Sequence, residues 1–163
     1  MKFGHQKGVS IASLVIIIII MIILSSAVVI TLSSLQENSK RVTFAKELKT
    51  IQDKVVEYYS VYGDLPISED ANAKQYTANE YISVVDVGAD ILYDEITLNN
   101  DIAETFYQIN LQKIDVKDTS RGAGNKGEDD IYLMTEKTHH VYYLKGYKVS
   151  DDRYFSRVNI DIK

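Results

Sequence analysis

The chain contains no cysteine, no tryptophan and only one proline, Pro66, among its 163 residues. Without cysteine, no disulfide bond can support the fold. Only three histidines are present, and neither their spacing nor any glycine-rich phosphate loop before a helix fits a catalytic site. We therefore do not expect the chain to be an enzyme.

Basic residues are the minority charge, with 18 lysines and arginines against 23 acidic residues and a net charge of −5. Two of the basic residues, Lys2 and Lys7, lie at the start of the chain, whereas every acidic residue follows residue 36. A domain of this acidity repels phosphate backbones, so we expect no nucleic-acid partner.

Charge of either sign is absent between Gly8 and Gln36. The segment 10–32, SIASLVIIIIIMIILSSAVVITL, consists mostly of leucine, valine, isoleucine and methionine. An apolar helix of about 20 residues matches the hydrocarbon core of a bilayer, so the sequence predicts a membrane-spanning helix. A secretory signal peptide would have an apolar core of roughly 7 to 15 residues and a small-residue cleavage site, which is not clear here. An ordinary signal anchor remains an alternative.

The following segment has the pattern of an amphipathic helix. Its apolar residues are spaced four and three apart, and charged residues fill the other faces. These apolar residues are Phe44, Leu48, Ile51, Val55, Tyr58 and Tyr62. Gly63 fits a left-handed C-terminal cap, and Pro66 prevents the helix from continuing.

Residues 63–163 are enough for one core. The last part alternates β-branched and aromatic runs with polar turns, which predicts a three-stranded antiparallel meander over residues 131–158. The preceding part is harder to assign. Residues 81–85 have strand composition, and residues 90–98 fit either helix or strand. Asn100–Asp101 fits the cap of a short helix, although the residues just after it could also form a strand.

Lys7-Gly8 directly before the apolar run, followed by Val9-Ser10-Ile11, resembles the class III leader of type IV pilins and type II secretion pseudopilins. The passage AKELKTIQDKVVEYYSVYGDLP, residues 45–66, is similar to the pilin transition from helix to head. The resemblance implies that a prepilin peptidase cuts between Gly8 and Val9. It also implies that Val9 becomes the N-methylated first residue of the mature chain.

The same resemblance implies an α+β, pilin-like fold built around one long N-terminal helix. Residues 1–8 would be the leader, 9–35 the membrane-spanning and assembly half of the helix, and 36–62 its amphipathic half. The globular extracellular head would be 63–163, with the meander 131–158 packed on the helix. The terminal hairpins look like those of pilin-like proteins from Clostridia-type Gram-positive bacteria.

The implied function is that of a structural subunit in a type IV pilus-like or type II secretion-like filament. Its partners would be a prepilin peptidase, other pilin-like subunits, an inner-membrane assembly platform and membrane lipid. Lys2 and Lys7 favour a cytoplasmic N-terminus of a single-pass protein in the cell membrane, with the head extracellular or in an extracellular filament. The alternative is a non-assembling, signal-anchored surface module, such as an adhesin or a sensor-like binding domain.

One departure from the family pattern bears on assembly. Most pilins carry glutamate at the fifth residue of the mature chain, where this sequence has Ser13. In the family, that glutamate is thought to pair with the terminal amine of a neighbouring subunit. Ser13 therefore favours a minor subunit over a major one.

The loop before the meander holds the strongest candidate for a metal site. Asn125, Glu128, Asp129 and Asp130 offer oxygen ligands in a glycine-rich segment, as calcium prefers, and some pseudopilins hold calcium in a similarly placed loop. An ordinary polar turn explains the same residues, and no other cofactor is expected. His139–His140 is a poor zinc site, because adjacent strand residues point to opposite faces.

We expect substitution of Gly8 to block removal of the leader, because the peptidase of this family recognises the glycine before the cut. Intact-mass measurement of the protein from cells that express a prepilin peptidase checks this. Normal processing of the variant would refute the assignment of the cleavage site.

Overall fold

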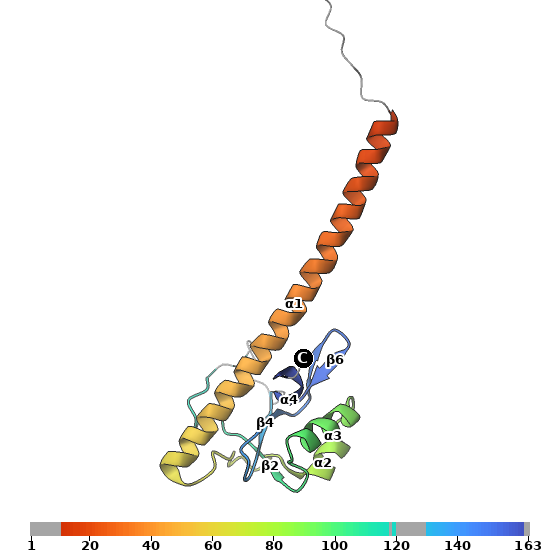
Figure 1. The fold of residues 1–163 in the computed structure, drawn as a ribbon. Coiled ribbons are helices and arrows are strands. Elements are labelled where there is room, and N and C mark those ends of the chain that lie inside the picture. Colours follow the sequence, from red (N-terminus) through yellow and green to blue (C-terminus); the bar gives the residue numbers. More distant parts are fainter. Residues whose placement is uncertain (1–10, 118, 120–129, 162–163) are drawn as a thin grey trace, which may run out of the picture. The chain divides into compact units, whose positions relative to one another are not determined.

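A computed structural model of the chain describes residues 11–117, 119 and 130–161, without the side chains of residues 11–13, 23–34 and 161. The chain divides into two units, Met1–Asn38 and Ser39–Lys163, and the boundary falls within the first helix. Figure 1 shows the ribbon with most of its elements labelled. The helices are α1 (Ile11–Tyr62), α2 (Ala78–Val84), α3 (Ala89–Leu98) and α4 (Val158–Asp161). The strands are β1 (Gln75–Thr77), β2 (Thr105–Gln108), β3 (Tyr132–Thr135), β4 (Val141–Tyr143), β5 (Tyr147–Val149) and β6 (Asp152–Tyr154).

The structure corrects the predicted membrane crossing. Over the part of the chain that the structure describes, no helix combines the length and apolar character that a bilayer crossing requires. The longest stretch of helix with described side chains, residues 35–62, carries charges on most turns.

Two expectations are therefore wrong. One is the pilin-like fold class with a long N-terminal helix whose first half, residues 9–35, spans a membrane. The other is the localisation as a single-pass membrane protein with a cytoplasmic N-terminus and an extracellular head. The structure does have α+β content and a small antiparallel sheet.

In the second unit, α1 buries one apolar stripe. Phe44, Leu48, Ile51 and Val55 are at most 1% exposed, and their spacing places them on one face of the helix. Each such side chain contributes about 1.5–3 kcal/mol when it is fully buried. Tyr62, which continues the same spacing, is 67% exposed, because the stripe ends before the last turn of the helix. Gly63 closes the helix at φ 66°, as the sequence predicts.

The stripe packs on a four-stranded antiparallel sheet with the strand order β1-β2-β3-β4. In the central strand β3, Tyr132 and Met134 face α1, whereas Leu133 faces the opposite side. In β4, Val141 and Tyr143 face α1, and Tyr142 faces away from it. The alternation follows the period of two of a strand, and both faces of β3 and β4 are buried.

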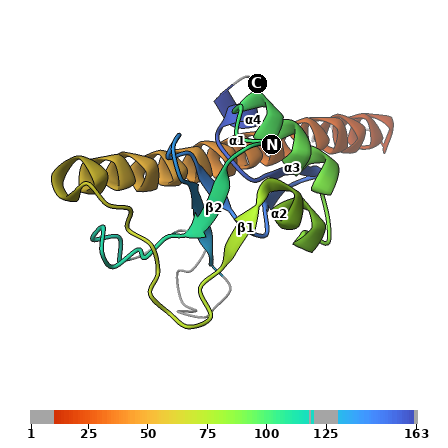
Figure 2. The same ribbon diagram turned by 90° about the horizontal axis from the view of Figure 1, so that it is seen from below.

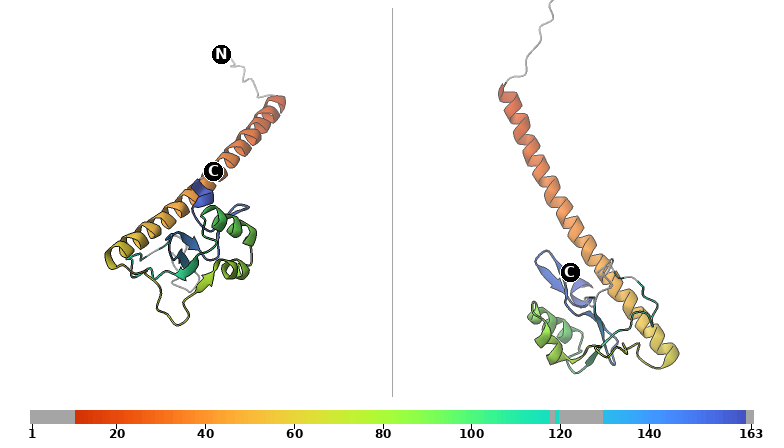
Figure 3. Two further views of the ribbon diagram at one scale, coloured as in Figure 1. Left: turned by 60° about the horizontal axis from the view of Figure 1, so that its bottom comes forward. Right: turned by 180° about the vertical axis from the view of Figure 1, so that it is seen from behind.

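Helices α2 and α3 cover the other face of the sheet. Thr77 caps α2 through a reciprocal capping box with Glu80, which satisfies two backbone N–H groups at the start of the helix. Tyr81 of α2 lies 5.4 Å from Phe106 of β2 between ring centroids, and its hydroxyl donates to the backbone oxygen of Tyr143 over 3.1 Å. The second unit is therefore a three-layer arrangement of α1, sheet and the α2–α3 pair (Figure 2; Figure 3).

The chain after residue 131 differs from the predicted single meander. Strands β3 and β4 belong to the four-stranded sheet, whereas β5 and β6 pair only with each other. A turn at Gly146, which adopts φ 66° and whose N–H donates to the backbone oxygen of Tyr143 over 3.0 Å, joins β4 to β5. The region left open by the sequence also becomes clear. Residues 78–84 form a helix where residues 81–85 suggested a strand, residues 89–98 form a helix, and residues 105–108 form a strand.

We expect Leu48→Ala to lower the free energy of unfolding by about 3 kcal/mol, because it leaves a cavity between α1 and the sheet. Val56→Ala is the matched control on the same helix, since Val56 is 46% exposed. The control should change stability by less than about 0.5 kcal/mol. Denaturant unfolding followed by circular dichroism measures both, and equal losses would contradict the assignment of the buried face.

Candidate functional site

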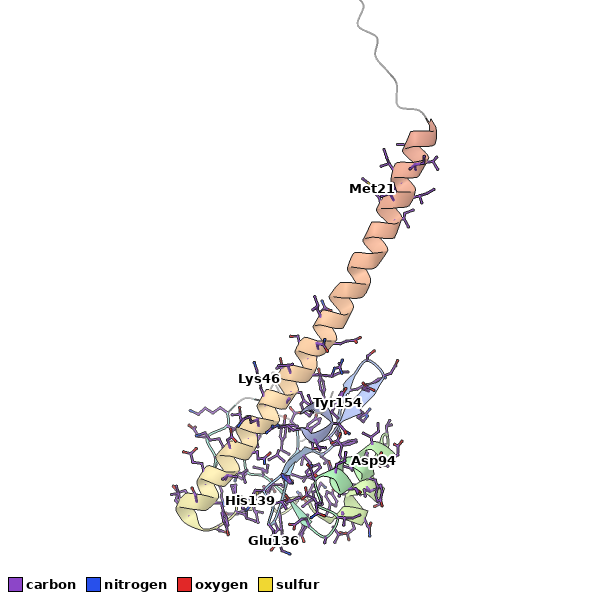
Figure 4. The ribbon with its side chains drawn as sticks, in the orientation of Figure 1. Met21, Lys46, Asp94, Glu136, His139 and Tyr154 are labelled. Atoms are coloured by element: carbon purple, nitrogen blue, oxygen red, sulfur yellow. The ribbon has the colours of Figure 1, made fainter. Side chains whose placement is uncertain are left out.

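The most unusual surface of the described chain is the apolar part of α1 in the first unit. Residues 14–22 are all leucine, valine, isoleucine or methionine, and each side chain is between 47% and 63% exposed. Figure 4 shows these side chains projecting from the helix, with Met21, which is 63% exposed, labelled. A helix that is apolar on every side is normally buried on every side.

The second half of α1 shows what such side chains do when a partner is present. There, apolar residues on one stripe are almost fully buried against the sheet, and most residues of the remaining faces are polar. Lys49 with Asp53 and Lys54 with Glu57 form exposed ion pairs along this helix at 2.6 and 2.8 Å. Residues 14–22 have no polar face, which makes them a candidate assembly surface.

The residues of the predicted cleavage site lie outside the described part of the chain. Gly8 and Val9 precede residue 11, and Ser13 lies in α1 without a described side chain. Their roles in processing and assembly stay predictions.

The predicted calcium ligands are described only in part. Asn125, Glu128 and Asp129 fall outside the described residues. Asp130 accepts a hydrogen bond of 3.0 Å from the Tyr143 hydroxyl. Over the described residues, no three histidine, cysteine, aspartate or glutamate side chains are grouped to hold a metal ion. Calcium binding at this loop stays an untested prediction.

The two adjacent histidines point to different partners. His139 has φ 56° and lies against Tyr59 of α1, with ring centroids 4.6 Å apart (Figure 4). The Nδ1 atom of His140 is 2.9 Å from a carboxylate oxygen of Asp101. Both rings therefore hold the β3–β4 hairpin to its neighbours.

Asp101 is the centre of a buried polar network. Its carboxylate is fully buried and accepts hydrogen bonds from the Thr138 and Tyr142 hydroxyls at 2.7 and 2.8 Å. Asn99 completes the network by donating to the Tyr142 oxygen over 2.7 Å. Burial, together with the Asp101 charge, raises the pKa of Tyr142 far above its usual value. The hydroxyl therefore stays protonated and keeps donating to Asp101.

Over the described residues, the hydrogen-bond partners of the Asp101 carboxylate belong to the β3–β4 hairpin, so the carboxylate anchors the hairpin to the loop after α3. An aspartate that orients a histidine also occurs in acid–base catalysis. Here the same carboxylate also accepts hydrogen bonds from the Thr138 and Tyr142 hydroxyls, as expected of a residue that holds the hairpin in place. The local sequence fits Asp101 to a helix cap, and its partners 37 to 41 residues later give no local signal.

Glu95 of α3 is a second fully buried carboxylate. It accepts hydrogen bonds from the backbone N–H groups of Phe155 and Ser156, and from the Asn159 amide over 3.1 Å. Burial raises the pKa of Glu95, and the hydrogen bonds from Ser156, Phe155 and Asn159 oppose that rise without cancelling it. Glu95 therefore fastens the segment between β6 and α4 to α3.

Comparison with protein-family models, with curated proteins and with solved structures finds no match to this chain. The class of protein therefore has to be argued from the residues and the geometry alone. The exposed apolar surface of residues 14–22 is the feature on which that argument depends.

The raised pKa of Glu95 predicts a pH dependence of stability. Because the folded chain binds this proton more tightly than the unfolded chain, stability falls as the pH rises from the ordinary glutamate pKa through the raised one. Glu95→Gln removes this titration. The difference in unfolding free energy between wild type and variant should shrink as the pH rises across that window, measured by urea unfolding. A constant difference would contradict the prediction.

Proposed function

We propose that this chain is a structural subunit of the pilin or pseudopilin kind. It would be cut after Gly8 by a prepilin peptidase and would assemble with similar subunits through the apolar part of α1. The observation that carries the proposal is the exposure of residues 14–22 on all sides of the helix. The Lys7-Gly8 leader and the amphipathic stripe of residues 44–55 support it.

The energetics favour assembly with several neighbours. Completing the burial of residues 14–22 would contribute on the order of 10 kcal/mol per subunit. A single partner helix, packed about 8–10 Å away, covers only one side of α1. The entropic cost of association is of the same order as the burial gain, at about 4–15 kcal/mol. One partner is therefore insufficient, and a bundle of many helices gives each copy full burial.

The head contributes no catalytic step to this function. Its two buried carboxylates, Asp101 and Glu95, hold the hairpin and the C-terminal segment in place. In the proposal, such anchors keep the head rigid while α1 supplies the contact with other subunits. Ser13, in place of the family's glutamate, favours the role of a minor subunit.

The proposal predicts that polar substitutions in the apolar part of α1 weaken assembly. We expect Ile16→Ser/Ile20→Ser to shift the full-length chain in mild detergent from large assemblies towards single copies. The reason is that two buried isoleucine contacts are lost, which is worth at least about a tenfold change in association. Sedimentation velocity, with electron microscopy of the same samples, measures the shift.

Val56→Ser/Val61→Ser is the matched control, because it places two serines on exposed positions of the same helix. This control should assemble like the wild type. If the wild type is already a single copy, or if both double variants behave alike, the proposal fails. A single-copy wild type would favour the alternative of a non-assembling binding module.

A further inference from the structure

A hollow in the second unit suggests a binding site that involves no residue of the assembly surface. It has a volume of about 360 Å³ and lies between the loop after α2 and the start of the β5–β6 hairpin. Small-ligand sites typically occupy about 300–1,000 Å³. Its lining includes Val84, Asp86, Val87, Lys145 and Arg153.

Arg153 is held firmly in the wall of this hollow. A Cβ atom at Gly88 would lie 2.9 Å from its Cδ atom, and a Cβ atom at Gly146 would lie 2.9 Å from its Cγ atom. Both glycines have positive φ, at 86° and 66°, so the backbone passes close to the arginine stem at two points. The fold itself already fixes this long side chain, so ligand binding would lose little further side-chain entropy there.

The bonds of Arg153 leave one edge of its guanidinium available. The Nη1 atom donates to the backbone oxygens of Lys145 and Gly146 at 2.6 and 3.2 Å. Among the described residues, no acceptor takes the Nε or Nη2 donors. These two donors form the edge that binds a carboxylate through two parallel hydrogen bonds.

We propose that this hollow binds the carboxylate of an acidic peptide segment that carries an apolar side chain beside it. Arg153 would bind the carboxylate, and Lys145 adds a second positive charge at the wall. Val84 and Val87, which are 49% and 60% exposed, would cover the apolar side chain. Asp86 repels a second negative charge, which favours a carboxylate over a phosphate dianion.

The first test compares two peptides on the full-length chain in mild detergent. Isothermal titration calorimetry with acetyl-Leu-Val-Asp-Val-amide should give saturable binding. The asparagine counterpart should bind at least about tenfold more weakly, because a charge-assisted pair of hydrogen bonds is lost. Equal affinities, or no saturable binding of the aspartate peptide at millimolar concentration, would overturn the proposal. So would inorganic phosphate competing as well as the peptide.

The second test assigns the binding to Arg153. Arg153→Gln should lower the affinity at least about tenfold, whereas Lys148→Gln removes the same charge from a residue outside the lining and should leave it unchanged.

Because Arg153 also supports the turn at Gly146, Val84→Ser at an exposed position gives a second variant that spares the fold. Val84→Ser should lower the affinity for the aspartate peptide several-fold. Asp86→Asn should raise that affinity. Equal effects of Arg153→Gln and Lys148→Gln, or an unchanged affinity in Val84→Ser, would overturn the assignment.

Discussion

The packing of one stripe of α1 against the sheet is the interaction on which the second unit depends. On the α1 side of β3 and β4 lies the stripe formed by Phe44, Leu48, Ile51 and Val55. The opposite face of the sheet packs against α2 and α3. With both faces covered, β3 can be buried at every position. Loss of the stripe would expose one whole layer of the core to water, at a cost of several kcal/mol.

Two buried carboxylates fix the positions of chain segments that apolar packing alone does not determine. Apolar layers fix which faces meet, but they specify poorly where a hairpin tip or a chain end lies along them. Asp101 fixes the β3–β4 hairpin, and Glu95 fixes the segment after β6, each through several donors with defined directions. The two carboxylates thereby stabilise the fold of the second unit.

The features predicted correctly from the sequence are those that depend on the spacing of apolar residues along the chain or on one residue type at one position. The stripe from Phe44 to Val55 and the cap at Gly63 are of this kind, and the structure has both. The helix α2 was missed because strand-like residues 81–85 outweighed the Thr77–Glu80 capping box, a signal that was present. The anchoring role of Asp101 depends on tertiary partners and had no local signal. The membrane crossing was inferred from the length of the apolar run and its lack of charge, and it proved wrong.

The central claim is that residues 14–22 of each copy are surrounded by the same helix of other copies. Because the chain has no native cysteine, a single cysteine placed in turn at each position from 14 to 22 reports on that position alone. The account predicts oxidative cross-links between copies, together with protection from a water-soluble maleimide, at positions all round the helix. Maleimide labelling at every position without cross-links between copies would contradict it.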